Sequence, residues 1–334
     1  MSTNPQGPRV TMLDVARAAG VSRALVSLAY RDAHGVSPRT RERILARGEE
    51  LGYVPDRMAA SLASRGVGSV GVHLQDLHND VFALIHDGIR AVMEHSGRDL
   101  VLSVGDLEGA RDLASLRALQ GARVGTVIAA GLLLPDAELR AFAARTPVVS
   151  VARAVEGVDS VCTDNALGAR LATEHLLALG HRRLVFLANP PSDGYLDRRR
   201  GFEAAVAGAG LSPRTVGIGY DRDGAAAATA RLLDGEDPPT AVFAHNDRAA
   251  LGVLDVAVDR GLVPGRDLSV VGYDNSSPGR APGTALTTVD LRAEELGRVA
   301  ARIAGDRMEH PEVPVMQEVL EPRLVVRGTA GPPA

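Results

Sequence analysis

The chain carries reactive residue types, but their spacing matches no catalytic or metal-binding pattern. All 37 basic residues are arginines, and without lysine there is no P-loop ammonium group and no Schiff-base nucleophile. The nine histidines show no metal-ligand spacing, and Cys162 is the one cysteine, which excludes a disulfide framework and a multi-cysteine metal site. No HExxH, GxSxG or dinucleotide-binding glycine pattern occurs. We therefore expect no enzymatic activity and no cofactor.

Arginines near the N-terminus instead suit nucleic-acid binding. Residues 1–65 hold ten arginines and six carboxylates, whereas residues 66–334 hold 27 arginines and 35 carboxylates. Arginine binds phosphates and the guanine edge, so a basic head on an acidic body favours a nucleic-acid-binding segment attached to a globular domain. Tryptophan is absent and aromatic residues make up 3% of the chain, which argues against a broad stacking platform for single strands.

Three short helices are predicted to position these arginines. A T-x-x-D capping box at Thr11 opens the first helix, and Gly20 ends it. Ser22 caps a second helix, and Ser37, followed by proline, caps a third. Two short helices joined by a Gly-Val-Ser turn predict a helix-turn-helix, whose second helix enters the DNA major groove.

A series of sequence patterns runs through this head in a fixed order. They are D-V-A-x-x-A-G-V-S, V-S, V-S-x-x-T-R-x-R-I, L-G-Y-x-P and A-x-x-L. With them the head resembles the DNA-binding domain of the lactose-repressor (LacI/GalR-type) family of bacterial transcriptional regulators. The resemblance implies that a homodimer binds double-stranded operator DNA. The family's usual T-V-S-R is Leu25-Val-Ser-Leu28 here, and its usual asparagine near the end of this segment is Arg31.

The second helix is expected to select the DNA sequence. Arg23 can bind guanine O6 and N7, whereas Leu28 offers only apolar contact, best matched by a thymine methyl group. In an alternative interpretation, Leu28 packs inward and contacts no base. The DNA-binding residues expected from the pattern and the resemblance are Thr11, Ser22, Arg23, Ala24, Ser27, Leu28, Arg31, Arg57, Ala59 and Leu62.

Residues 55–66 link the head to the rest of the chain. The resemblance implies a hinge helix here, which becomes ordered on operator DNA and pairs with its copy across the dimer. Leu62 would then enter the minor groove, where an apolar wedge unstacks a base step and bends the duplex. The small Ala59 and Ala60 would allow close helix approach. The alternative is a plain linker with one exposed leucine.

From Val67 onward, short apolar runs alternate with amphipathic helices. Alternating strands and helices predict parallel sheets covered on both faces by helices. Two such series predict two doubly wound lobes, with ligands bound where the carboxyl ends of the strands meet. The expected strands lie at 70–74, 99–104, 124–129 and 147–151, and then at 184–187, 215–218, 241–244 and 268–272.

Further patterns extend the resemblance over nearly the whole body. They include E-H-L-L-A-L-G-H at 174–181, P-T-A-V-F-A-H-N-D at 239–247 and V-V-G-Y-D-N at 270–275. This resembles the family's effector domain, which has the periplasmic sugar-binding-protein fold. The fold class expected for the chain is α/β: a three-helix helix-turn-helix head and a hinge helix, then two doubly wound α/β lobes. The expected domains are 1–54, 55–66 and 67–330, with lobe 1 at about 67–162 and 290–318 and lobe 2 at about 163–289 and 319–330.

The resemblance also implies an effector site on the loops that follow the strands. Carboxylates and amides bind paired hydroxyls, arginine binds two oxygens, and an aromatic ring covers the apolar face of a sugar. Relative to the family, Ala152 replaces a carboxylate and Asp80 adds one, so the effector is expected to be an unusual sugar or not a simple sugar. The implied effector-binding residues are Asp76, Asn79, Phe82, Arg153, Arg198, Tyr220, Asn246, Asp247 and Asp274.

Several of the polar residues also have structural interpretations. Asp247 could simply cap the helix that follows it. Asn275 is expected in a turn. His181, directly after Gly180, is expected to stabilise the end of a helix through the helix dipole. Cys162 is expected in the core of a strand.

These observations favour a ligand-responsive, sequence-specific transcriptional regulator, and we expect a cytoplasmic repressor of a sugar or related catabolic operon that binds a pseudo-palindromic operator. Its expected effector is a sugar or sugar derivative. No apolar run approaches the ~18 residues that span a bilayer, and the N-terminus lacks the apolar core of a signal peptide. The alternative is a small-molecule binding protein of the periplasmic sugar-binding class without a regulatory role. An enzyme on the same fold is a third possibility, which no catalytic pattern supports.

Overall fold

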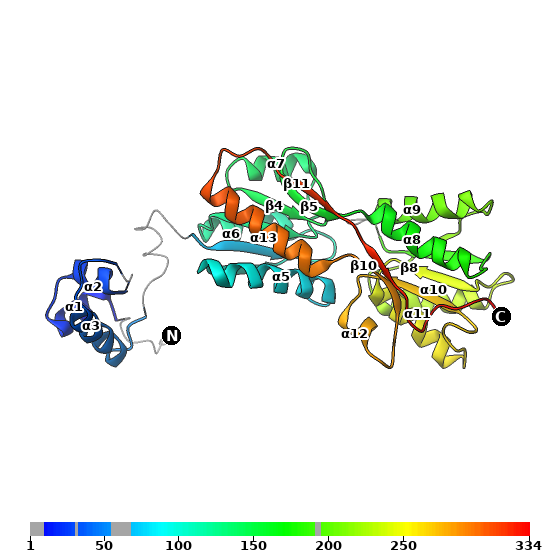
Figure 1. The fold of residues 1–334 in the computed structure, drawn as a ribbon, viewed down its shortest axis with the longest axis horizontal. Coiled ribbons are helices and arrows are strands. Elements are labelled where there is room, and N and C mark those ends of the chain that lie inside the picture. The colour runs from blue at the N-terminus through cyan, green and yellow to red at the C-terminus, as the bar shows by residue number, and fades with distance from the viewer. Residues whose placement is uncertain (1–9, 31–32, 55–67, 191–194) are drawn as a thin grey trace, which may run out of the picture. The chain divides into compact units, whose positions relative to one another are not determined.

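A computed structural model describes residues 10–30, 33–54, 68–190 and 195–334. The chain divides into two compact units, a head (Met1–Val67) and a body (Gly68–Ala334). Figure 1 shows three helices in the head and, in the body, two lobes in which helices cover a central sheet. The expected α/β architecture is confirmed. Within the described residues, no helix is long and apolar enough to cross a membrane.

The described part of the head consists of α1 (Met12–Ala19), α2 (Arg23–Tyr30) and α3 (Pro38–Glu50). The predicted capping box is present, because the Asp14 amide donates to Thr11 Oγ1 at 3.4 Å and the Thr11 amide donates to Asp14 Oδ2 at 2.9 Å. The turn from α1 to α2 passes through Gly20, whose φ of 65° suits a residue without a Cβ. The helix starts predicted from the sequence are thus confirmed.

The head has a small apolar core of its own. Tyr30 and Tyr53 meet edge to face beside this core, with ring centroids 5.3 Å apart. Apolar residues of all three helices are buried against one another, so the helices support each other without the body. The buried apolar residues are Val15, Ala16, Ala19, Val26, Ala29 and Ile44.

Lobe 1 is built on a six-stranded parallel sheet with the strand order β11-β5-β4-β3-β1-β2. Helix α13 (Ala293–Glu309) packs against α5 (Asp80–Ser96) on this lobe. The strands are β1 (Val70–Leu74), β2 (Leu100–Val104), β3 (Thr126–Ala130), β4 (Val148–Val151), β5 (Asp159–Thr163) and β11 (Gln317–Leu320). The other helices are α6 (Asp112–Gly121) and α7 (Asp136–Ala143).

Lobe 2 has the corresponding order β12-β10-β9-β8-β6-β7. Its last strand differs from the expected parallel arrangement, because β12 is antiparallel to β10. The chain leaves lobe 2 for lobe 1 at the end of β10 and returns to lobe 2 at the start of β12. The end of β10 and the start of β12 therefore lie at the same boundary, so the two strands run in opposite directions. The strands are β6 (Leu184–Ala188), β7 (Thr215–Gly217), β8 (Ala241–Ala244), β9 (Ser269–Tyr273), β10 (Thr287–Asp290) and β12 (Arg323–Val325). The helices are α8 (Asn165–Ala178), α9 (Tyr195–Gly208), α10 (Arg222–Leu233), α11 (Asp247–Asp259) and α12 (Ser277–Arg280).

The chain passes between the lobes three times, after Thr163, after Asp290 and after Leu320. The last crossing, expected near residue 318, lies slightly later because Val319 and Leu320 still pair with β5. Figure 1 shows β10 and β11 beside these crossings, with the C-terminal segment running from one lobe to the other. Each lobe is therefore assembled from separate stretches of the sequence.

Two glycines allow α5 and α13 to cross closely. A Cβ at Gly88 would collide with the carbonyl oxygen of Glu294, and one at Gly297 would collide with the carbonyl oxygen of Ile85. Neither helix can therefore shift away without losing buried contact area. This packing fixes the start of α5, which lies at the boundary between the lobes.

Candidate functional site

A cavity of about 90 Å³ lies between the two lobes. In both sheets, β1 and β6 each lie between the next two strands of the chain, so the strand order reverses beside them. Ligands of such sheets bind outside the carboxyl ends of the strands at this position. The cavity follows that rule closely, because seven of its lining residues are the first residue after a strand. They are Gln75, Gly131 and Ala152 in lobe 1, Asn189, His245 and Asp274 in lobe 2, and Leu291 at the crossing after β10.

The structure brings seven of the nine predicted effector-binding residues to this cavity. Their role as effector contacts stays a prediction, but their common location is an observation. Lobe 1 supplies Asp76, Asn79 and Phe82, and lobe 2 supplies Arg198, Tyr220, Asn246 and Asp274.

Arg153 does not belong to the cavity lining, contrary to expectation. Its guanidinium group turns back into lobe 1, where it donates to the carbonyl oxygens of Leu132 (3.0 Å) and Leu134 (2.6 Å) and pairs with Asp136. These contacts satisfy most of its donors, so Arg153 stabilises loops of lobe 1.

Asp247 also lies outside the cavity lining, fully buried at the start of α11. Its carboxylate accepts hydrogen bonds from the amide (2.7 Å) and hydroxyl (2.8 Å) of Ser276 and from the Thr288 hydroxyl. Burial raises the pKa of Asp247 to about 6, although these hydrogen bonds act in the opposite direction. The residue that caps α11 is Asn246, whose Oδ1 accepts from the Ala249 amide at 2.9 Å. Asp247 instead ties α11 to the loop that carries Asp274.

Arg198 is held rigidly in the wall of lobe 2. Its Nε donates to Asn165 Oδ1 at 2.9 Å, and its Nη1 donates to the carbonyl oxygen of His245 at 2.7 Å. The guanidinium carbon also lies 3.8 Å from the centroid of the Tyr273 ring, a cation–π contact. With the group oriented in this way, its other amino group can bind a ligand without a further loss of side-chain entropy.

Asp274 is the second charged residue of the wall of lobe 2. Its φ of 121° is costly for a residue with a Cβ, and strain of this kind concentrates at binding sites. Burial raises the pKa of the carboxyl group well above its ordinary value, whereas the nearby Arg198 lowers it. Asp247 and Asp80 raise it further. Arg198 therefore supplies the positive charge that stabilises the carboxylate form.

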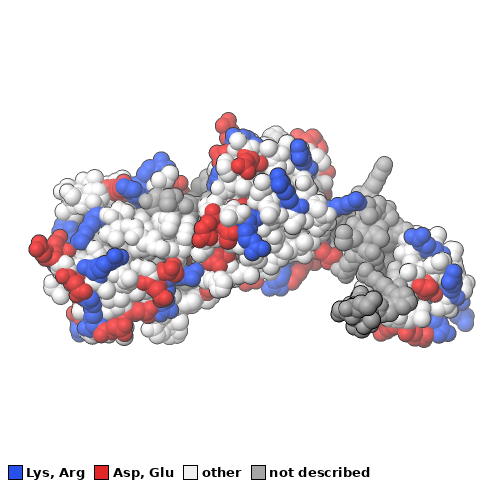
Figure 2. Space-filling model, turned by 180° about the vertical axis from the view of Figure 1, so that it is seen from behind, with Lys and Arg blue, Asp and Glu red and all other residues white. Residues whose placement is uncertain are grey.

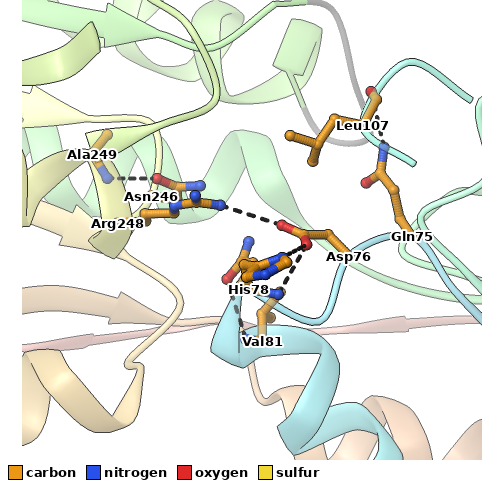
Figure 3. Close-up of polar contacts among 9 residues, drawn as sticks. Gln75, Asp76, His78, Val81, Leu107, Asn246, Arg248 and Ala249 are labelled. Carbon is orange, nitrogen blue, oxygen red and sulfur yellow. Dashed lines mark hydrogen bonds and ion pairs between the residues drawn. The ribbon is translucent and has the colours of Figure 1, made fainter. Parts of the chain in front are cut away.

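An ion pair connects the two lobes at the cavity. Arg248, on α11, donates from Nη1 to Asp76 Oδ2 at 3.2 Å, and these residues are 172 positions apart in the sequence. The other carboxylate oxygen of Asp76 lies 2.9 Å from both the amide and the ring Nδ1 of His78. Figure 3 shows dashed lines from the Asp76 carboxylate to both His78 and Arg248. Arg248 was not predicted from the sequence.

The two walls of the cavity differ in chemistry. Lobe 1 presents mostly apolar side chains, and its polar residues already bond within the protein: Gln75 donates to the carbonyl oxygen of Leu107 at 3.5 Å, and Asn79 caps α5. Lobe 2 presents mainly charged groups, amides and rings. The apolar residues lining the cavity are Val81, Phe82, Ile85, Leu107, Leu291 and Leu296.

Three residues with structural interpretations can also be placed. The ring of His181 does not bond to the helix end, contrary to expectation: it is buried and bonds to Thr240 Oγ1 at 2.9 Å and to the carbonyl oxygen of Gly331 at 2.9 Å. Burial lowers the pKa of this histidine, so its neutral form is favoured. Asn275 adopts a left-handed turn conformation with φ of 57°, and Cys162 is partly buried in β5.

The predicted DNA-binding residues of the head lie mainly at the start of α2. Ser22 caps this helix, since its Oγ accepts from the Leu25 amide at 3.2 Å. Arg23 and Ala24 are exposed in the first turn. Leu28 is partly buried, yet Leu25 and not Leu28 packs against the core of the head.

Of the remaining predicted DNA-binding residues, two belong to the described part of the chain and four do not. Thr11 is exposed and engaged in the capping box of α1, and Ser27 is partly buried on α2. Arg31, Arg57, Ala59 and Leu62 lie outside the described residues. The hinge prediction for residues 55–66 falls on the same undescribed stretch.

Charge is mixed over one face of the body. Figure 2 shows basic and acidic side chains interspersed there. In the described part of the chain, no group of three or more histidine, cysteine, aspartate or glutamate residues could hold a metal ion.

Both parts of the chain match known protein families. Residues 11–56 match the model of bacterial regulatory proteins of the lacI family, and residues 173–330 match a periplasmic binding protein-like domain. Catabolite control protein A of Priestia megaterium is 31% identical over 302 residues, which cover 88% of this chain and 91% of that protein.

Solved structures agree with these sequence matches. The lac repressor dimer bound to operator and the anti-inducer ONPF matches with a TM-score of 0.85 and 28% identity, covering 97% of this chain and all of that chain. A complex of the transcriptional regulator CelR with cellobiose matches with a TM-score of 0.71 and 30% identity, covering 96% of this chain and all of that chain. The chain belongs to the lacI family of bacterial regulatory proteins.

Proposed function

We propose that this protein is a ligand-responsive transcriptional repressor of a sugar or related catabolic operon. The observation that carries the proposal is one chain that combines a helix-turn-helix head with a body enclosing a cavity between two lobes, lined by both charged and apolar residues. A small molecule that favours one arrangement of the lobes would shift the equilibrium between states that differ in operator affinity. This role places the protein in the cytoplasm, with its DNA, and assigns it no catalytic step.

The proposed DNA target is a pseudo-palindromic operator bound by a homodimer. One head covers little DNA, so a two-fold pair of heads supplies both affinity and half-site spacing. The similar lac repressor structure is likewise a dimer bound to operator. Arg23, exposed at the start of α2 and without an ion-pair partner among the described residues, is the proposed base-reading residue.

The proposed effector is a polyhydroxylated small molecule. The charged groups and amides around the cavity can bind hydroxyls, and the similar CelR structure holds cellobiose. A periplasmic-type binding protein without a regulatory role stays the alternative, which the head disfavours. Thermal-shift screening of the full chain against sugars, nucleosides and polyols identifies the effector, because a bound ligand raises Tm by mass action.

The test of the regulator function is operator selection from random DNA duplexes. We expect a two-fold symmetric site, affinity that falls steeply with salt, and affinity that changes when the effector is added. Arg23→Ala should weaken binding and relax one base position, whereas Arg117→Ala, an exposed arginine of the body, should not. Absence of any preferred DNA site would contradict the proposal and favour the binding-protein alternative.

A further inference from the structure

Asn189 is a buried polar residue of the cavity for which the sequence suggested no role. It follows β6 directly, lines the cavity and is 3% exposed. Among the described residues, no group hydrogen-bonds to its amide oxygen, which is itself inaccessible to solvent. Buried polar atoms in folded proteins nearly always have a partner, because a buried group without one has lost its bonds to water.

Other amides around the cavity lack this property. Gln75 donates to the carbonyl oxygen of Leu107, while Asn79 and Asn246 cap helices with their side-chain oxygens. Their hydrogen bonds explain their presence by local structure alone. Asn189 has no such explanation among the described residues.

The charges around Asn189 restrict what could bind there. Arg198 and Asp274 line the same cavity from lobe 2. An anionic ligand group would be repelled by the carboxylate form of Asp274, which Arg198 stabilises against the effect of burial, and a cationic group would be repelled by Arg198. A neutral hydroxyl avoids both penalties. It can also donate to the oxygen of an amide or accept from its nitrogen, so it suits either orientation of the Asn189 side chain.

We propose that Asn189 is a specificity-determining residue whose amide binds one hydroxyl group of a neutral polyol effector. The inference rests on the proposed function, since it concerns the effector of that same cavity. It predicts that the protein rejects analogues lacking this one hydroxyl, because such analogues leave the amide without a partner. The apolar wall of lobe 1 then faces the less polar side of the effector.

The first measurement needs no effector. Asn189→Leu replaces the amide by an apolar group of similar size, and removal of an unpartnered buried polar group is neutral or stabilising. We expect the Tm of the full-length variant, without added ligand, to equal or exceed that of the wild type. A clearly lower Tm would show that the amide is bonded within the protein and would overturn the inference.

The second measurement uses D-ribose, D-glucose, D-galactose, cellobiose and myo-inositol as probes, followed by monodeoxy analogues of the probe that binds. We expect Asn189→Leu to weaken binding of that probe about tenfold, as the loss of one hydrogen bond predicts. One deoxy analogue should bind the variant and the wild type equally. Gln120→Ala, an amide in lobe 1 bonded to Thr146 away from the cavity, serves as the control and should bind like the wild type.

The outcomes separate this inference from the regulator function. Equal weakening of every deoxy analogue by Asn189→Leu, or full probe affinity in the variant, overturns the role of Asn189. If the wild type binds operator DNA but none of the probes, the polyol inference fails and the regulator function stands. If it binds neither, both fail.

Discussion

Lobe 1 and lobe 2 have equivalent strand orders but present opposite chemistry to the cavity between them. In lobe 2, the Arg198 guanidinium is fixed by three contacts and interacts electrostatically with the buried Asp274. In lobe 1, apolar side chains such as Phe82 dominate the lining. A polar wall with fixed groups selects a ligand by hydrogen bonds, whereas an apolar wall contributes affinity in proportion to the area it buries. Equivalent frameworks can therefore divide specificity and affinity between them.

The largest effect is expected from removing the fixed charge of lobe 2. Arg198→Ala should weaken effector binding about 100-fold, because hydrogen bonds to charged groups contribute about 1.5–3 kcal/mol each. Operator affinity without effector should change little, since this arginine lies in the body. Isothermal titration and DNA binding measure the two effects, with Arg200→Ala, a surface arginine of the same helix, as control. Equal loss of both functions would identify Arg198 as a structural residue.

A smaller effect is expected from the apolar wall. Phe82→Ala should weaken effector binding about tenfold, because roughly half of the ~1.5–3 kcal/mol available from a buried aromatic side chain is lost. Phe82→Leu should retain most of the affinity. Selection among deoxy analogues is assigned to lobe 2. If Phe82→Ala changed which deoxy analogues are rejected, the apolar wall of lobe 1 would also determine specificity, and the division of roles between the two walls would be wrong.

Breaking the ion pair between the lobes should raise effector affinity modestly, whereas the two preceding variants lower it. The cavity of about 90 Å³ is well below the ~300 Å³ of small ligand pockets, so binding requires the lobes to move apart. Arg248→Gln removes the pair with Asp76 and should raise effector affinity up to about fivefold, as expected for a partly exposed pair. Arg260→Gln, which loses a pair within lobe 2, is the control. Lower affinity in Arg248→Gln would mean that Arg248 contacts the effector directly.

The smallest effect concerns acid stability of lobe 2. Burial lowers the pKa of His181 below 6.5, so the unfolded chain binds more protons than the folded chain as pH falls below 6.5. The stabilising contribution of the neutral ring is complete above this pH and declines below it. Between pH 7 and 5.5 the Tm of His181→Gln should therefore fall less than that of the wild type. Asp247, with its pKa raised to about 6, acts oppositely but equally in both proteins, so parallel curves would refute the assignment.

The sequence predicted the helix starts and strands well, because their signals are local. Thr11, Gly20 and Ser37 mark helix ends through backbone geometry and nearby amides, and the structure confirms all three. Apolar runs in the body likewise coincide with the central strands of both sheets. The antiparallel direction of β12 was not predictable in this way, since it follows from where the chain re-enters lobe 2.

The candidate site was predicted only in part. The residues directly after β1, β6 and β8 line the cavity, so this position would have identified Gln75, Asn189 and His245 in addition to Asp274 after β9. No local signal distinguishes Asp247, which bonds within lobe 2, from its neighbour Arg248, which reaches lobe 1. Contacts between segments this far apart depend on how the lobes pack, and local patterns carry no information about that.

The three crossings between the lobes also constrain how the protein is synthesised. The head contains its own core within the first 54 residues, so it can fold soon after it leaves the ribosome. Neither lobe can complete its sheet until residues 317–325 have emerged, because β11 and β12 form one edge of each. A chain terminated before Gln317 would expose the edges of β5 and β10, which are templates for aggregation. Premature termination would thus yield a folded DNA-binding head attached to an aggregation-prone body.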